Sequence, residues 1–182
     1  MDFKIIAPIL ISCLPTYVFA NFDEPKPTLS LGASSMALVQ SVKYKDSSNT
    51  TNTFAGLQLI AAGNLTDNFQ LQTSLYRLQY TDNSELTVYG NNFKANFGTG
   101  FMSKGFRSYL SVGIFSESFD NGTKSERING LEVGAAMGYS FNKVSIDYGF
   151  SVRDSSDYQQ DSLYANADVI SATGFLNFSG EF

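Results

Sequence analysis

Apolar and polar side chains alternate without interruption through residues 131–153. The intervening residues are mostly Gly, Ser and Ala, and the apolar face carries Leu131, Val133, Ala135, Met137, Tyr139 and Phe141, then Val144, Ile146, Tyr148, Phe150 and Val152. Alternation of this kind has the period of a strand and not of a helix. Asn142 and Lys143 lie where a two-residue turn would reverse the chain. The stretch therefore predicts an antiparallel hairpin with one apolar face.

The alternation does not by itself say which face of the hairpin is inside. A soluble ligand-binding barrel has the same pattern, with its apolar face lining a cavity. However, a water-exposed sheet surface is usually rich in Lys, Glu and Thr, whereas the small residues found here suit a narrow, crowded lumen. We therefore expect the apolar face to contact lipid, and we keep the soluble barrel as an alternative.

Strand-like segments recur along the chain about every twenty residues, at residues 28–42, 53–62, 69–80, 91–102, 106–116, 128–141, 144–153 and 167–182. Tight connections alternate with longer polar ones, which is the layout of an outer-membrane barrel with its turns and termini in the periplasm. The predicted fold is all-β, an eight-stranded antiparallel up-and-down transmembrane β-barrel over residues 28–182. A soluble β-sandwich is an alternative that does not explain the regular alternation of loop lengths.

The first twenty residues predict a signal peptide for export. Lys4 precedes an apolar run at residues 5–14, and residues 18–20 form a small-residue cleavage site. Residues 21–27 would then be a short lead before the barrel. A competing interpretation is lipoprotein processing, which would leave Cys13 as a lipidated N-terminus.

Aromatic residues are expected to form girdles at the two membrane interfaces. The group assigned to the periplasmic edge is Phe69, Phe101, Phe106, Tyr139, Phe141 and Phe182, and the group assigned to the outer edge is Tyr44, Tyr80, Phe93 and Tyr164.

The last segment, residues 168–182, ends on Phe182, with alternate residues Ile170, Ala172, Gly174, Leu176 and Phe178 in the same register. This ending resembles the assembly signal of bacterial outer-membrane proteins, which the barrel-assembly machinery reads, although Gly180 stands where an apolar or aromatic residue is more usual. The chain as a whole resembles the small eight-stranded barrels of the outer-membrane protein A and outer-membrane protein X group. The resemblance implies a monomer in the cell outer membrane, in contact with outer-membrane lipid and lipopolysaccharide.

The lumen of an eight-stranded barrel is just wide enough to be filled by its own side chains. The turn at residues 142–143 sets a register that pairs Glu132 with Arg153 and Asp147 with Gly138, and strand counting places Lys94 and Arg107 at matching heights. The resulting hypothesis is two charge clusters that close the lumen, Glu132/Arg153/Lys94 above and Asp147/Arg107 below. They could form a gate, but the favoured interpretation is mutual satisfaction of buried charges. Replacing Arg153 with alanine should then raise conductance or lower thermal stability.

Charged residues also cluster in the predicted outer loops. The acidic ones are Asp154, Asp157, Asp161 and Asp168, together with Glu117, Asp120 and Glu126. A hard cation or a basic partner could bind them, but their spacing matches no calcium-loop motif and a solvated loop is expected. The basic residues Lys43, Lys45, Lys124, Arg127 and Arg153 could meet lipopolysaccharide phosphates at the outer rim.

Several classes of function are disfavoured by composition. The net charge is −5 without a basic cluster, so nucleic-acid binding is not expected. The chain has no histidine, whereas the enzymes built on similar barrels, among them lipid A palmitoyltransferase and lipid A deacylases, resemble one another in relying on one. We therefore predict no catalytic residue, no metal site and no cofactor.

The sequence thus predicts a non-enzymatic outer-membrane barrel whose surface loops mediate interactions, or which serves membrane integrity. Two alternatives stay open. One is a narrow channel or transporter for small or apolar solutes, and the other is a soluble secreted ligand-binding barrel. The charge cluster of Glu132, Arg153 and Lys94 distinguishes the non-enzymatic barrel from the channel. If these side chains close the lumen, they oppose the passage of solutes.

Overall fold

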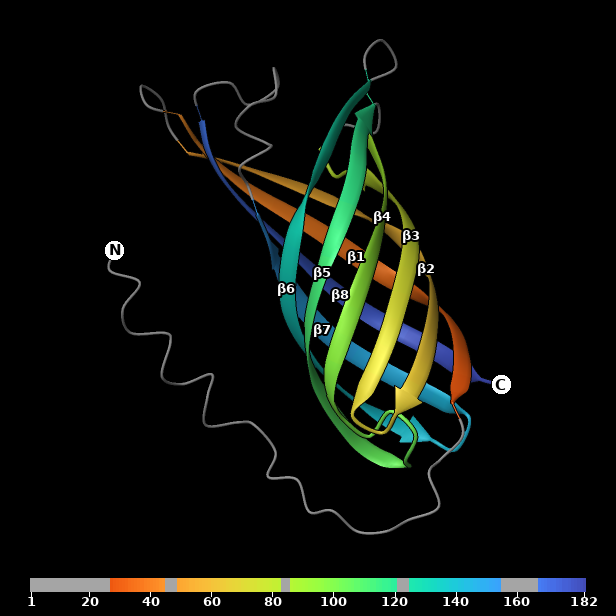
Figure 1. The fold of residues 1–182 in the computed structure, drawn as a ribbon. Helices are drawn as coiled ribbons and strands as arrows, with labels where there is room; N and C mark the ends of the chain where they lie inside the picture. Colours follow the sequence, from red (N-terminus) through yellow and green to blue (C-terminus); the bar gives the residue numbers. More distant parts are fainter. Residues whose placement is uncertain (1–26, 45–48, 83–85, 121–124, 155–166) are drawn as a thin grey trace, which may run out of the picture.

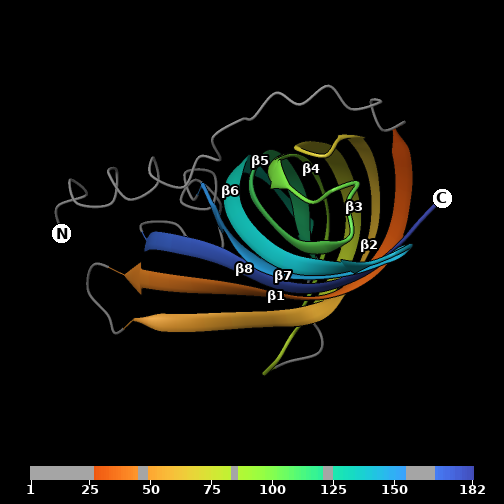
Figure 2. The same cartoon turned by 90° about the horizontal axis from the view of Figure 1, so that it is seen from below.

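The structure is a computed structural model that describes residues 27–44, 49–82, 86–120, 125–154 and 167–182. These residues form the strands β1 (Thr28–Tyr44), β2 (Thr50–Thr66), β3 (Phe69–Tyr80), β4 (Thr87–Thr99), β5 (Gly105–Asp120), β6 (Ser125–Phe141), β7 (Val144–Arg153) and β8 (Ala167–Glu181). Each strand pairs antiparallel with the next, and β8 pairs with β1, so that the sheet closes on itself (Figures 1 and 2). The predicted eight-stranded antiparallel barrel is confirmed. The predicted signal peptide (1–20), including Cys13, lies outside the described residues.

The β6–β7 hairpin forms as its alternation predicts. Asn142 has a φ of 63°, the left-handed conformation that a two-residue hairpin turn requires and that asparagine tolerates. The resulting register pairs Glu132 with Arg153 and Gly138 with Asp147, as expected. The C-terminus lies at the same end of the barrel as the short turns (Figure 1). No helix in the described part of the chain is long and apolar enough to cross a membrane.

The outward face of every strand is predominantly apolar near the short turns and becomes polar near the long connections. The last apolar and first polar outward residues are Val39 and Ser41 on β1, Ala55 and Thr53 on β2, Leu75 and Arg77 on β3, Phe93 and Asn91 on β4, Ile114 and Ser116 on β5, Leu131 and Asn129 on β6, Val152 and Asp154 on β7, and Ile170 and Asp168 on β8. Residues 131–141 of β6 and 144–152 of β7 match the roughly 9–11 tilted residues that cross a bilayer. The apolar band is therefore the lipid-facing surface of the barrel.

The interior changes in the opposite sense. Near the short turns it is mostly polar, apart from a small cluster around Phe101 and Tyr109. Near the long connections it holds an apolar core of Met36, Leu38, Val42, Phe54, Tyr76, Leu78, Val88, Phe115, Phe119, Ile128 and Val169. Beyond the lipid-facing band the wall of the barrel faces water, so apolar side chains are more stable inside. The outer part of the barrel therefore has an apolar interior and a polar exterior, as a water-soluble protein does.

This inversion of polarity, in which the outward face becomes polar and the interior apolar, explains why several predicted strands were too short. The expected ends at residues 42, 53, 91, 116 and 128 fall close to the edge of the apolar band, and the strands continue past it. The phase of β1 is set by Ser34, Met36 and Leu38, which all point inward.

Phe101 and Phe182 were both assigned to the aromatic girdle at the periplasmic edge, and the structure places them differently. Phe182 is 78% exposed, and its backbone N–H donates to the carbonyl of Leu29 at 2.8 Å. Phe101 was wrongly assigned to the aromatic girdle. It is fully buried, because it packs against the inward-facing residues Tyr109 and Ala136.

Candidate functional site in the lumen

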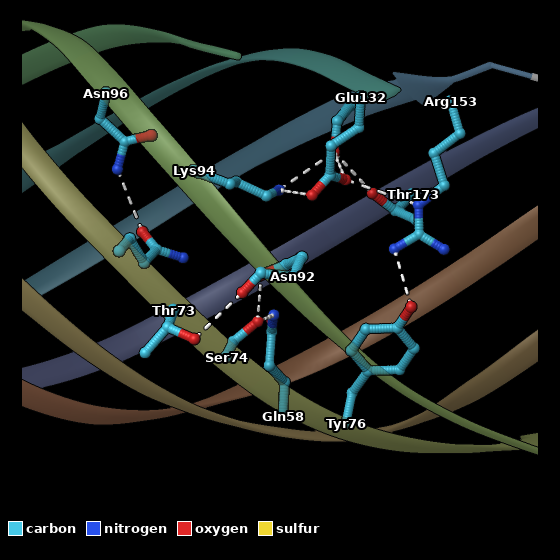
Figure 3. Close-up of polar contacts among 12 residues, drawn as sticks. Gln58, Thr73, Ser74, Tyr76, Asn92, Lys94, Asn96, Glu132, Arg153 and Thr173 are labelled. Atoms are coloured by element: carbon cyan, nitrogen blue, oxygen red, sulfur yellow. Dashed lines mark hydrogen bonds and ion pairs between the residues drawn. The ribbon is translucent and has the colours of Figure 1, made fainter. Parts of the chain in front are cut away.

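The lumen brings Lys94, Glu132 and Arg153 together in its middle layer (Figure 3). Lys94 Nζ lies 3.3 Å from Glu132 Oε1, and Arg153 Nε lies 3.5 Å from Glu132 Oε2. Lys94 and Arg153 approach the carboxylate from opposite sides, so that one anion lies between two cations (Figure 3). All three side chains are almost completely shielded from solvent.

A second carboxylate, Glu117, balances the charge of this layer. Arg153 Nη1 donates to Glu117 Oε2 at 2.6 Å, and the Tyr76 hydroxyl donates to the same oxygen at 2.9 Å. The guanidinium carbon of Arg153 also lies 4.5 Å from the centre of the Phe115 ring. The middle layer therefore contains two cations and two anions, and we call Lys94, Glu132, Arg153 and Glu117 the charged layer.

The predictions for Glu117 and for one role of Arg153 are wrong. Glu117 was expected in an acidic outer loop, but β5 continues to Asp120 and keeps Glu117 on the inward face. Arg153 was expected to contact lipopolysaccharide at the rim, whereas its side chain is buried inside the barrel. The signal that could have placed Glu117 is its phase, since it follows Arg107 and Tyr109 at even spacing along the strand.

Arg107 and Asp147 form a separate pair closer to the short turns. Arg107 donates through Nε to Oδ1 and through Nη2 to Oδ2 of Asp147, which is the two-pronged geometry of the strongest ion pairs. Both residues are buried. The structure thus brings Lys94, Glu132 and Arg153 together in one group and Arg107 and Asp147 in another.

Glycines let these pairs reach across three strands. In each case the middle strand contributes a glycine to the same cross-strand row, giving Lys94–Gly113–Glu132, Arg107–Gly138–Asp147 and Tyr76–Gly90–Glu117. A Cβ atom at Gly138 would collide with the carboxylate of Asp147, and one at Gly90 would collide with the ring of Tyr76. The small residues on the lumen face therefore make room for long side chains from the neighbouring strands.

Neutral polar side chains fill the lumen beside the charged groups and toward the short turns. Asn96 Nδ2 donates to Gln70 Oε1 at 2.7 Å, and Gln70 Nε2 donates to Asn64 Oδ1 at 2.6 Å. Gln58, Ser74 and Asn92 form a second chain of hydrogen bonds, part of which is visible in Figure 3. A cavity beside Arg107 and Asp147 has a volume of about 10 Å³, which is no more than a single water molecule needs.

Phe101 closes the periplasmic mouth. Its ring lies 5.3 Å from that of Tyr109, and Phe175 packs against the cluster that these two residues form with Ala136. Gly100 precedes it with a φ of +84°, a conformation that favours glycine and directs the chain inward. Asp67 holds this turn by accepting hydrogen bonds from the backbone N–H groups of Gly100 and Met102.

Those acidic residues of the predicted outer loops that the structure describes do not form a metal site. In the part of the chain that the structure describes, no three His, Cys, Asp or Glu side chains are arranged to hold a metal ion. Asp157, Asp161, Lys45, Lys124 and Tyr164 lie outside that part.

A closed eight-stranded barrel with a lipid-facing band and a filled lumen has the fold of the small transmembrane barrels of the bacterial outer membrane. No family model and no curated protein matches the sequence. Among solved structures, Neisserial surface protein A is 13% identical, with 84% of this chain and 97% of that chain covered and a TM-score of 0.60. Ail, the attachment invasion locus protein of Yersinia pestis, is 14% identical over 84% of this chain and 98% of that one, with a TM-score of 0.51.

A third similar structure is the N-terminal β-barrel domain of OprF from Pseudomonas aeruginosa. It is 16% identical, with 82% of this chain and 97% of that chain covered and a TM-score of 0.50. The structural neighbours are bacterial outer-membrane proteins, and at these identities the similarity is one of fold.

Proposed function

We propose that this chain is a non-enzymatic barrel of the cell outer membrane that works as a monomer with a closed lumen. Its role is carried by its outer surface and loops, or by its contribution to membrane integrity. The barrel-assembly machinery would read Phe182 during insertion, and outer-membrane lipid and lipopolysaccharide would surround the apolar band. The observation that supports this proposal best is that side chains fill the lumen from one end to the other. They are Phe101, which plugs the mouth, the Arg107–Asp147 pair and the neutral polar side chains, the charged layer, and the outer apolar core.

The charged layer argues against the alternative of a channel. Its two cations and two anions neutralise one another, and a passing solute would have to separate buried ion pairs at a cost of several kcal/mol. A gate would need a second stable arrangement of these side chains. Mutual satisfaction of buried charges is therefore the interpretation that we adopt for Glu132, Arg153 and Lys94.

The contact between Lys94 and Ser151 in the lumen resembles the serine–lysine pair of some enzymes. Lys94 Nζ lies 3.4 Å from Ser151 Oγ, and a serine activated by a lysine can act as a nucleophile. However, Ser151 is fully buried and its hydroxyl is also hydrogen-bonded to Glu132 and Thr173. Because a substrate could not reach this hydroxyl, the contact supports a structural role.

The proposal is tested by reconstituting the mature protein into planar bilayers and into liposomes. We expect no stepwise conductance and no swelling of liposomes in small sugars. On a gel, the unheated protein should migrate differently from the boiled protein, which is typical of a closed membrane barrel. Stepwise conductance by the unmodified protein would favour the channel. A protein that shows no heat shift and is monomeric without detergent would revive the soluble ligand-binding barrel.

A further inference from the structure

The outward wall of β3–β6 carries two arginines just beyond the edge of the lipid-facing band. Arg77, Tyr89, Ser118 and Arg127 lie in one cross-strand row, which we call the arginine row. The two arginines are exposed, and Tyr89 is 45% exposed. Three strand spacings place their Cα atoms roughly 14 Å apart.

The next row toward the membrane is polar on three of its four strands. It consists of Leu75, Asn91, Ser116 and Asn129, and the row below it contains the apolar residues Phe93, Ile114 and Leu131. Moving along the wall away from the short turns, the surface thus changes from apolar to hydrogen-bonding to cationic. A lipid presents the same sequence of acyl chain, linkage and charged headgroup.

The side chains of this patch are arranged to bind an anion from the side. The guanidinium carbon of Arg77 lies 5.4 Å from the centre of the Tyr89 ring, which holds the side chain against the wall. Arg127 Nε donates to Ser116 Oγ at 3.2 Å, and the rest of its guanidinium group can bind an anion. Between them, Tyr89, Asn91, Ser116 and Ser118 line a hollow of about 350 Å³.

Neither the arginine row nor the polar row next to it contains an acidic residue on β3–β6. The outward carboxylates Asp120 and Asp154 belong to the adjoining rows, and Asp154 borders a separate hollow of about 480 Å³ beside Phe93 and Leu131. By contrast, Lys43 at the outer end of β1 lies opposite Asp168. Within the described ladders, the arginine row is therefore a place where cations face outward without a carboxylate in register.

We propose that the arginine row binds the phosphorylated headgroup of a lipid in the outer leaflet, with the acyl chains lying on the apolar band below it. Guanidinium groups recognise phosphate through paired, charge-assisted hydrogen bonds. The neighbouring hydroxyl and amide groups would bind sugar or linkage oxygens. This inference rests on the proposed outer-membrane location and adds a specific lipid contact to it.

The experiment compares lipid binding by the folded full-length mature protein and by two double variants. In one, Arg77 and Arg127 are replaced by glutamine. In the matched control, Lys104 and Lys143 in the short turns are replaced by glutamine, which removes the same charge from the opposite end. Native mass spectrometry from detergent micelles would measure retention of diphosphoryl lipid A, with phosphatidylcholine as the reference lipid.

We expect each arginine to contribute about tenfold to the affinity for diphosphoryl lipid A, so that the arginine variant binds about a hundredfold more weakly while the control binds as the unmodified protein does. Equal binding by the arginine variant and the unmodified protein, or an equal loss in the control, would overturn the proposal. So would competition by millimolar inorganic phosphate, which would indicate a site for a free anion, or loss of a dimer in the variant, which would indicate an interface between copies.

Heat-shift measurements on the arginine variant and on the unmodified protein keep the two proposals distinguishable. An unchanged heat shift with unchanged lipid binding rejects the arginine row alone. A missing heat shift in the unmodified protein rejects the outer-membrane proposal on which it rests.

Discussion

Replacing Arg153 with glutamine tests whether the charged layer stabilises the barrel. Arg153 contacts both carboxylates of the layer, Glu117 at 2.6 Å and Glu132 at 3.5 Å, and it donates to the Tyr76 hydroxyl at 3.2 Å. The substitution leaves Glu132 with Lys94 at 3.3 Å, but it removes the guanidinium partner of Glu117, whose side chain is fully buried. The layer would then hold one cation and two anions.

The expected loss is about 3–5 kcal/mol of the free energy of unfolding, which is typical of breaking a buried ion pair from one side. Replacing Glu117 with glutamine in the same chain removes the carboxylate that has lost the Arg153 guanidinium. The double variant should therefore regain stability and lie within about 2 kcal/mol of the unmodified protein. Conductance should not rise in either variant, because the Phe101 plug and the outer apolar core remain in place.

The assay is urea unfolding in lipid vesicles, followed by the heat-dependent gel shift and by circular dichroism. Lys143 is exposed in the β6–β7 turn, so Lys143→Gln is a control that should change the stability by less than about 0.5 kcal/mol. A loss below about 1 kcal/mol for Arg153→Gln, or a double variant as unstable as the single one, would refute the assigned role of the ion pair.

Three further predictions concern the lumen glycines, the plug and the inversion of polarity. Gly138→Val should destabilise the barrel by about 1–3 kcal/mol through overpacking, whereas Gly63→Val, where a Cβ would meet nothing within 4 Å, should be nearly neutral; equal urea midpoints for the two would contradict the space-making role. Phe101→Ala should cost about 3 kcal/mol by leaving a cavity, measured in the same assay, and a loss within error would mean that the ring does not pack as described. Met137→Arg, near the middle of the lipid-facing band, should cost about 2–4 kcal/mol, and Asn129→Arg, beyond its edge, about 0–1 kcal/mol. Similar costs at both positions would place the membrane boundary elsewhere.

The β6–β7 hairpin shows how much of the structure can be predicted from the sequence alone. Its uninterrupted alternation and two-residue turn were enough to predict both strands, their register and the pairing of Glu132 with Arg153. The same counting placed Lys94 and Arg107 near their partners. These predictions succeed because they depend on the period of a strand and on a short turn, which are local properties.

Glu117 and Phe101 show where sequence reasoning was wrong. Glu117 was assigned to a loop because the apolar alternation of β5 stops at Ile114, and Phe101 was assigned to the lipid because it is aromatic and close to a turn. Placing either residue correctly requires knowing what surrounds the strand at that height. Neither side chain carries that information by itself.

The sequence by itself determined which residues share a face in the clearly alternating strands, and hence the barrel class and the pairing of Glu132 with Arg153. Only the tertiary structure decided where each face meets lipid, water or the packed interior. The physical reason is that the strand period is set by backbone geometry, whereas the medium around a side chain depends on how all eight strands tilt and stagger across the membrane boundary.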